Sequence, residues 1–304
     1  MTQTVLLVGA TGHLGARVTH HLLADADARL RLLVRRGTLG DPAKRHALAP
    51  FIDGGAEIIE GDLADPSSLD RATRGVDVVV SCIQGGPEVI VDGQLAFVDA
   101  ARRNGVRRVL PSDFALDFFD GPTELHLPFH LRKRADAAIA QSGLEHVHVL
   151  NGGFMDVVAA PLAGILDREA GAIRFWGTGE ERFDLTSVED TARFTARAAL
   201  DRDLPSGKFA VSGAQLSFHD MAVAVEAATG TPLRRESLGS VQELRRQLED
   251  ATARDPNPYA RLGERYQLFM LTVPPPSDLR NEHYDGLRPE PFAAFAQRQF
   301  GQET

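Results

Sequence analysis

A glycine-rich turn close to the start of the sequence constrains the fold of this chain more than any other feature. The apolar residues 5–8 lead into Gly9, Gly12 and Gly15, and a helical pattern of apolar residues follows. In a strand–turn–helix unit of this kind the first glycine permits a sharp turn, the second lets the backbone approach a pyrophosphate, and the third allows close packing. The alternative is a turn that uses glycine for steric reasons alone. The residues predicted to bind phosphate here are Gly9, Thr11, Gly12, His13, Leu14 and Gly15.

Composition narrows the class of protein. The 304 residues, 43% of them hydrophobic, can build one large α/β domain or two smaller ones. The net charge of −9 offers no basic surface for nucleic acid. The single cysteine, Cys82, excludes an internal disulfide, no apolar run is long enough to span a membrane, and no signal peptide is apparent. We therefore expect a cytoplasmic monomer or homodimer with neither nucleic acid nor membrane as a partner.

Strands and helices are predicted to alternate through the first half of the chain. This alternation predicts an α/β fold with a Rossmann-type, doubly wound parallel sheet, whose ligands bind at the carboxyl ends of the strands. Residues 1–150 are expected to form this domain, and residues 151–304 mainly a smaller α+β substrate domain that ends in an irregular tail. Parts of residues 185–212 are candidates for packing on the first sheet. The predicted strands are residues 5–8, 30–34, 56–60, 76–82, 106–110 and 146–150.

Two arginines close the second predicted strand. A site specific for NAD usually has an acid at this position to accept from the ribose 2′-hydroxyl, whereas arginine suits a 2′-phosphate. Arg35 and Arg36 stand here with no acid beside them, so the sequence favours NADPH over NADH. The alternative is a solvated basic turn.

Further candidate cofactor residues follow the later strands. Asp62 is placed either to bind the adenine amine or to cap the next helix. The small residues after the fourth strand could admit a nicotinamide ribose, or mark an ordinary turn. Ser112 and Asp113 follow the fifth strand, although Ser-Asp is also a helix-cap pattern. The candidates after the fourth strand are Ser81, Cys82, Ile83, Gln84 and Gly85.

An ordered set of motifs resembles a known family, the NmrA-like, isoflavone-reductase-like branch of the atypical short-chain dehydrogenases. The motifs are GATGHLG at residues 9–15, LLVRR at 32–36, GDLADPSSL at 61–69, VLPSDFALD at 109–117, SGLEHVHVLNGGF at 142–154 and SVEDTARF at 187–194. The resemblance implies a Rossmann domain with a smaller substrate domain, and NADPH held by the glycine loop and Arg35. The family includes reductases of phenolic and flavonoid-type substrates, quinone reductases, and members that bind the dinucleotide as regulators.

The usual catalytic pair of the wider superfamily, a tyrosine with a lysine one helical turn later, is absent, because none of the three tyrosines has such a lysine. Reductases of the resembled branch instead use a lysine on the helix before the Ser-Gly turn, and Arg132 occupies that position. Arginine stays charged, so hydrogen bonding and electrostatic stabilisation are its available roles. Arg132 and Asp136 flank an apolar helical stripe and would otherwise form an ordinary surface ion pair.

Proton transfer, if the reaction needs it, has two candidates nearby. They are His126 and His130, because histidine is the side-chain type suited to proton exchange near neutral pH, although a histidine in a loop is more often simply exposed. Asn151, Gly153 and Phe154 follow the sixth strand and are expected to line the substrate side of the nicotinamide. The aromatic residues of the second half could line an apolar pocket, but such residues are more often core. No metal site and no nucleophile elbow is indicated.

The sequence is consistent with three functions. The leading hypothesis is an NADPH-dependent reductase that transfers hydride to a carbonyl, or to a conjugated or quinonoid double bond, of an apolar and aromatic small molecule. The second is a non-catalytic NADP(H) sensor that acts on a protein partner. The third is a non-redox enzyme, an isomerase or cyclase, on the same fold.

Overall fold

The computed structural model describes residues 2–160, 163–255, 257 and 259–301, and the chain divides into two compact units. The first unit contains the chain up to Asp113, with Leu131–Val149 and Thr191–Phe209. The second contains Phe114–His130, Leu150–Asp190 and the chain from Ala210 onward. The chain therefore passes between the units several times, and the first unit recruits residues 191–209 from the second half of the sequence.

A seven-stranded sheet forms the centre of the first unit, in the order β11-β6-β5-β4-β1-β2-β3. The neighbouring pairs from β3 to β6 run parallel. The order reverses between β1 and β4, which makes the carboxyl ends of these two strands the switch point of the sheet. The strands are β1 (Gln3–Val8), β2 (Ala28–Arg35), β3 (Glu57–Gly61), β4 (Val78–Ser81), β5 (Arg108–Leu110), β6 (Glu145–Leu150) and β11 (Gly207–Ala210).

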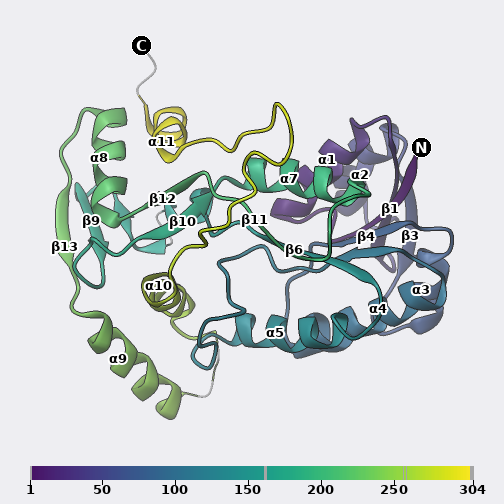
Figure 1. The fold of residues 1–304 in the computed structure, drawn as a ribbon, viewed down its shortest axis with the longest axis horizontal. Helices are drawn as coiled ribbons and strands as arrows, with labels where there is room; N and C mark the ends of the chain where they lie inside the picture. The colour runs from purple at the N-terminus through teal and green to yellow at the C-terminus, as the bar shows by residue number, and fades with distance from the viewer. Residues whose placement is uncertain (1, 161–162, 256, 258, 302–304) are drawn as a thin grey trace. The chain divides into compact units, whose positions relative to one another are not determined.

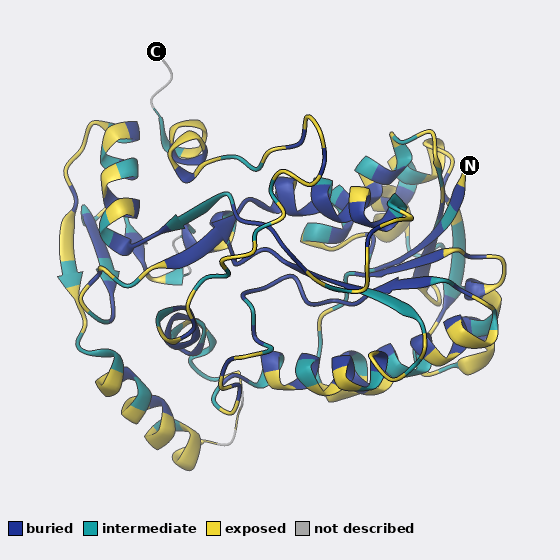
Figure 2. Cartoon of the chain, in the orientation of Figure 1, coloured by how far each residue is buried: buried dark blue, intermediate teal, exposed yellow. Residues whose placement is uncertain are grey.

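Helices cover both faces of this sheet. Figure 1 shows α3, α4 and α5 along one face and α1, α2 and α7 along the other. Figure 2 shows that the central strands β1, β4 and β5 are buried, whereas the edge strand β3 is mostly half-buried. Val78, Val79 and Val80 of β4 have no exposed surface, as expected for a strand covered on both sides. The first residues of α5 and α7 belong to the second unit. The helices are α1 (His13–Leu23), α2 (Pro42–Asp53), α3 (Pro66–Thr73), the π-helix η1 (Glu88–Gly93), α4 (Gln94–Arg103), α5 (Leu127–Ile139) and α7 (Val188–Leu200).

A buried arginine ties the connection between α7 and β11 to the sheet. Arg108 of β5 is 1% exposed, and its guanidinium donates to the carbonyl oxygens of Ala198, Asp201 and Leu204. Glu145 lies beside it and supplies the opposite charge. These bonds satisfy a charge and three carbonyl groups that would otherwise be costly to bury.

The second unit contains two small sheets, in the orders β12-β10-β7 and β13-β9-β8. Their strands are β7 (Gly153–Phe154), β8 (Leu166–Asp167), β9 (Ala172–Phe175), β10 (Phe183–Thr186), β12 (Ala214–Leu216) and β13 (Arg234–Ser237). The accompanying helices are α6 (Met155–Val158), α8 (Phe218–Thr229), α9 (Val241–Arg254), α10 (Leu262–Thr272) and α11 (Phe292–Phe300). Phe175 and Phe183 lie in the main core of this unit and Trp176 in a smaller cluster with Leu244 and Leu248, so these aromatic residues are core.

The expectation of an irregular tail is wrong for much of its length. Ser240 and Glu243 form a capping box that starts α9, and Leu244 and Leu248 bury one face of that helix at a spacing of one turn. The helices α10 and α11 follow. Prolines at 274–276 lie between those two helices, where they cannot interrupt either one.

Candidate functional site

The glycine loop lies at the switch point because β4 approaches it closely. The Cys82 N–H donates to the carbonyl oxygen of Val8 at 2.9 Å. Gly9 has a φ of +89°, and a Cβ there would lie 2.3 Å from the Cys82 carbonyl oxygen. A Cβ on Gly15 would lie 2.1 Å from the Gly9 carbonyl oxygen. Only glycine fits these two positions, so the loop is a tightly packed backbone cradle.

Helix α1 begins directly after this cradle. Its N-cap residue, Gly12, makes no side-chain cap, and the first turn contains no acidic residue. Thr11, Gly12 and His13 are exposed, while Leu14 is half-buried. Arg17 adds a positive charge on the next turn and donates to the His13 carbonyl at 2.7 Å. The first N–H groups of the helix and its dipole therefore suit an anionic group.

The two arginines at the end of β2 differ in their surroundings. Arg36 forms an ion pair with Asp65, which is the N-cap of α3. Arg35 is exposed, and its side chain has no ion-pair partner among the described residues. Arg35 is therefore the arginine that remains available for a ligand at this edge of the sheet.

Asp62 is exposed and does not cap α3, because Asp65 accepts from the Ser67 N–H at that position. The Asp62 carboxylate instead accepts from the Ala64 N–H at 2.9 Å, which closes a local turn. The capping alternative for Asp62 is thus wrong, since the helix begins one turn later than that role requires.

Ser112 connects the ends of β4 and β5. Its hydroxyl donates to the Ile83 carbonyl at 2.6 Å, and its N–H donates to the side-chain oxygen of Gln94 at 3.2 Å. The Nε of Arg132 donates to the Ser112 carbonyl at 2.7 Å. The predicted residues of the β4 loop, the β5 loop and α5 are therefore brought together within the first unit.

The loop after β4 combines buried and exposed residues. Ser81 is buried, Ile83 and Gly85 are half-buried, and Gln84 is exposed. Burial raises the pKa of the Cys82 thiol to about 12. This cysteine consequently stays protonated at neutral pH, and its contribution is its backbone, which packs against the glycine loop.

The expected surface ion pair between Arg132 and Asp136 is wrong. Arg132 is 8% exposed and Asp136 is 2% exposed. Neither carboxyl oxygen of Asp136 has a hydrogen-bond partner among the residues that the structure describes. The side chains flanking the apolar stripe of α5 point inward because the loop after β5 covers this side of the helix, where Arg132 bonds to Ser112.

Five predicted residues belong to the second unit: His126, His130, Asn151, Gly153 and Phe154. His126 is 3% exposed and stacks on Phe129, with ring centroids 3.7 Å apart. Its Nδ1 accepts from the Phe129 N–H at 3.3 Å. His130, one turn further along, is exposed. The aromatic packing of His126 favours a role in the core of this unit.

The turn after β6 is built on contacts that only the tertiary structure reveals. Asn151 is fully buried, its N–H donates to the Ala115 carbonyl and its amide donates to the Gly152 carbonyl. Gly153 is buried in β7, and Phe154, half-buried, is the N-cap of α6. These residues are held rigidly within the second unit.

A titratable residue next to this turn, Asp184 of β10, was missed by the sequence reasoning. It is 2% exposed, and burial raises its pKa to about 7, with Asp117 as a second cause. Its carboxylate packs against Gly152, where a Cβ would lie 2.6 Å from Oδ2. Its position in a strand of apolar residues was the available signal.

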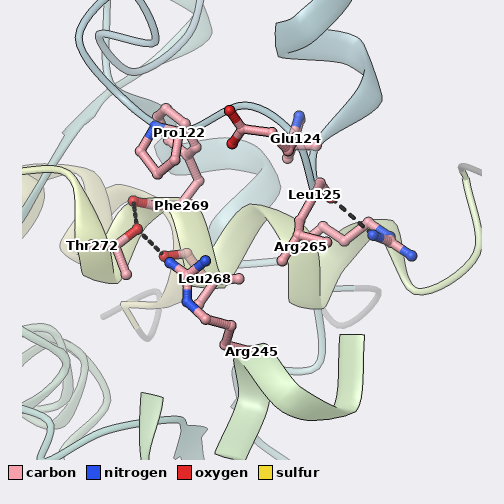
Figure 3. Close-up of a pocket in the computed structure, with 9 residues that line it drawn as sticks. Pro122, Glu124, Leu125, Arg245, Arg265, Leu268, Phe269 and Thr272 are labelled. Carbon is pink, nitrogen blue, oxygen red and sulfur yellow. Dashed lines mark hydrogen bonds between the residues drawn. The ribbon is translucent and has the colours of Figure 1, made fainter. Parts of the chain in front are cut away.

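A small cavity of about 20 Å³ lies in the second unit (Figure 3). Arg265 lines it and is 4% exposed, but its guanidinium donates to Leu125, Ala260 and Thr252. A volume of this size suits a water molecule rather than an aromatic ligand, for which pockets of at least about 300 Å³ are usual. The cavity is therefore a packing feature.

The sheet order and the glycine loop at its switch point define a Rossmann-type α/β protein. The chain belongs to the NmrA-like family, whose model matches residues 1–269. Among the described residues, no helix has the length and apolar character needed to cross a bilayer.

Several named relatives are plant reductases or reductase homologues. The chain is 32% identical over 247 residues to an isoflavone reductase homolog from Zea mays, covering 76% of each chain. It is 30% identical over 206 residues to a phenylcoumaran benzylic ether reductase from Ginkgo biloba, covering 65% of each.

Solved structures share the fold over nearly the whole chain. AtPrR2 with NADP+ and (+)pinoresinol matches with a TM-score of 0.81 at 24% identity, covering 98% of this chain and 99% of that one. The binary complex of leucoanthocyanidin reductase and NADPH from Vitis vinifera matches with a TM-score of 0.79 at 20% identity, covering 97% and 98%. At these identities the likeness concerns the fold.

Proposed function

We propose that this protein binds NADPH at the carboxyl edge of its seven-stranded sheet and reduces an aromatic small molecule. The observation that carries the proposal is the glycine cradle at the switch point, followed by an uncapped helix N-terminus and flanked by the unpaired Arg35. The reductases among the named relatives support the reaction class.

The residues present suit this cofactor. The backbone of the cradle and the first turn of α1 would hold the pyrophosphate, and Arg35 the 2′-phosphate. Ser112 and the backbone at Ile83 would define the nicotinamide end of the site. When bound, NADPH supplies the hydride, and the protein orients both reactants and excludes water.

Arg132 would act by charge and hydrogen bonding. A guanidinium keeps its proton near neutral pH, so Arg132 would stabilise developing negative charge on a substrate oxygen rather than donate a proton to it. Its Nε is already bonded to Ser112, which fixes the orientation of the guanidinium plane.

The surroundings of Arg132 also favour a second candidate function. Because Arg132 is buried and bonded to the backbone, its position also suits a protein that binds the dinucleotide without turning it over. That protein would be a sensor of NADP(H), which passes the bound state to a protein partner.

One pair of measurements tests these functions. Arg35→Ala should weaken NADPH binding by about 10- to 100-fold, because a charge-assisted bond to phosphate is lost, and should leave NADH binding almost unchanged. Arg29→Ala is the matched control, since Arg29 is an exposed arginine at the opposite end of β2. Equal losses for both cofactors would refute the phosphate assignment.

Turnover separates the reductase from the sensor. The protein is mixed with NADPH and a panel of quinones, enones and aromatic ketones, and cofactor oxidation is followed by absorbance. The reductase is supported if NADPH is oxidised and if Arg132→Ala lowers the rate of oxidation far more than it weakens NADPH binding. Tight binding without oxidation across the panel supports the sensor.

A further inference from the structure

Two buried acids and a histidine converge behind the proposed cofactor edge. Asp113 follows β5, Asp136 lies on α5 and His148 on β6, and one ligand atom from each lies within 4.8 Å of the others. The three residues are 1%, 2% and 5% exposed. Oδ2 of Asp113 lies 2.7 Å from Nδ1 of His148, which in turn lies 3.8 Å from Oδ1 of Asp136.

Within the described part of the chain, three carboxyl oxygens of this cluster have no hydrogen-bond partner: Oδ1 of Asp113 and both oxygens of Asp136. Two ionised carboxylates in contact, away from water, repel one another and lose their hydration. Burial, and then the charge of Asp113, raises the pKa of Asp136 to about 10, although Arg132 acts in the opposite direction. The charged and titratable groups that face Asp136 are thus Asp113, His148 and Arg132.

A proton accounts for this cluster better than a metal ion. Carboxylates and imidazole are ligand types that a divalent metal accepts. However, Nδ1 of His148 is already engaged with Asp113, and Arg132 brings a positive charge next to the cluster. A proton shared by the two acids brings one positive charge next to Arg132, where a divalent ion would bring two, and it leaves the contact between His148 and Asp113 in place.

We propose that Asp136 is a positioning residue that stays protonated and donates a hydrogen bond to the carboxylate of Asp113, thereby fixing the Ser112–Asp113 segment. Successive turns of α5 then hold successive residues of this segment, Arg132 at the Ser112 carbonyl and Asp136 at the Asp113 side chain. The consequence for the cofactor rests on the proposed function, because Ser112 contacts Ile83 at the nicotinamide end of that site.

Two variants at one position test the consequence for the cofactor. Asp136→Asn keeps a donor towards Asp113 but cannot titrate, whereas Asp136→Leu is similar in size and has no donor. We expect Asp136→Asn to keep most of the affinity for NADPH at neutral pH, and Asp136→Leu to lose about tenfold or more. Affinity of Asp136→Leu equal to that of the wild-type protein would overturn the proposal.

The pH profile provides a readout that a purely structural role would not move. Above the Asp136 pKa of about 10, the wild-type protein should lose NADPH affinity while Asp136→Asn does not. The same alkaline loss in both proteins, with circular dichroism showing both folded, would count against a titrating Asp136.

Infrared spectroscopy tests the proton itself, without cofactor. At about pH 9 an ordinary aspartic acid is ionised, so the wild-type protein should show the carbonyl band of one protonated carboxylic acid that Asp136→Asn lacks. Absence of that band would overturn the proposal, whereas a band in a protein that does not bind NADPH would refute the proposed function alone. A stoichiometric metal ion in the purified protein, lost in Asp136→Asn, would replace the proton with a metal site.

Discussion

Asp184 of β10 should make the stability of the protein fall as the pH rises. Burial raises the pKa of its carboxyl group from 3.8 to about 7, so the folded state binds the proton more tightly than the unfolded state does. A group whose pKa is raised by folding stabilises the folded state fully at pH values below its pKa in the unfolded protein. This stabilisation is lost as the pH rises through its pKa in the folded protein. Between about pH 4 and 7 the free energy of unfolding should fall by about 1.4 kcal/mol per pH unit from this residue.

Asp184→Asn removes this dependence. The shift of about three pKa units corresponds to about 4 kcal/mol, so the variant should gain up to that amount over the wild-type protein between pH 4.5 and pH 8. The measurement is urea unfolding of both proteins at the two pH values. Taking the difference between the two pH values cancels any constant cost of the amide.

The control for this experiment is Asp167→Asn, which should show the opposite sign. Asp167 is half-buried, and the backbone N–H of Ala170 lowers its pKa. Its small contribution to the stability of the folded protein is present at neutral pH and is lost on acidification. If Asp184→Asn has the same pH dependence as the wild-type protein, the account of Asp184 as a buried, late-ionising acid is refuted.

Two glycine substitutions test the close backbone contacts. Gly15→Ala should reduce NADPH affinity at least about tenfold and lower the melting temperature, because its Cβ would lie 2.1 Å from the Gly9 carbonyl oxygen. Gly40→Ala is the control, since the atom nearest to its Cβ would lie 3.6 Å away. Equal effects of the two substitutions would contradict the close packing of the glycine cradle. Gly152→Ala should destabilise the protein by about 2 kcal/mol or more, since it combines a φ of +67° with a Cβ 2.3 Å from the Asp184 carbonyl oxygen. Gly230→Ala has a similar φ of +68° in open space and should cost less; an equal loss there, measured by urea unfolding, would show that φ alone decides.

Local patterns explain which parts of the fold could be predicted. The alternation of apolar strands with helices indicated the parallel sheet, because each strand must bury both faces under crossover helices. Parts of residues 185–212 were candidates for packing on the first sheet, but no local pattern indicated that β11, from residues 207–210, would join its edge beside β6. That placement depends on contacts such as those of Arg108 with residues almost a hundred positions away.

The sequence by itself indicated the glycine loop, since the spacing of the glycines after an apolar strand is visible in the chain and the contact of Gly15 with Gly9 is local. Only the tertiary structure brought Cys82 against Gly9. The sequence also marked Arg35 by its place at the end of a strand, whereas Arg132 was marked by the family resemblance. Only the tertiary structure decided that Arg132 and Asp136 point inward, and that Asp136 meets an acid from another element. Burial and neighbouring charge, which set the ionisation of such a group, arise from residues brought together by folding and leave no periodic trace in the chain.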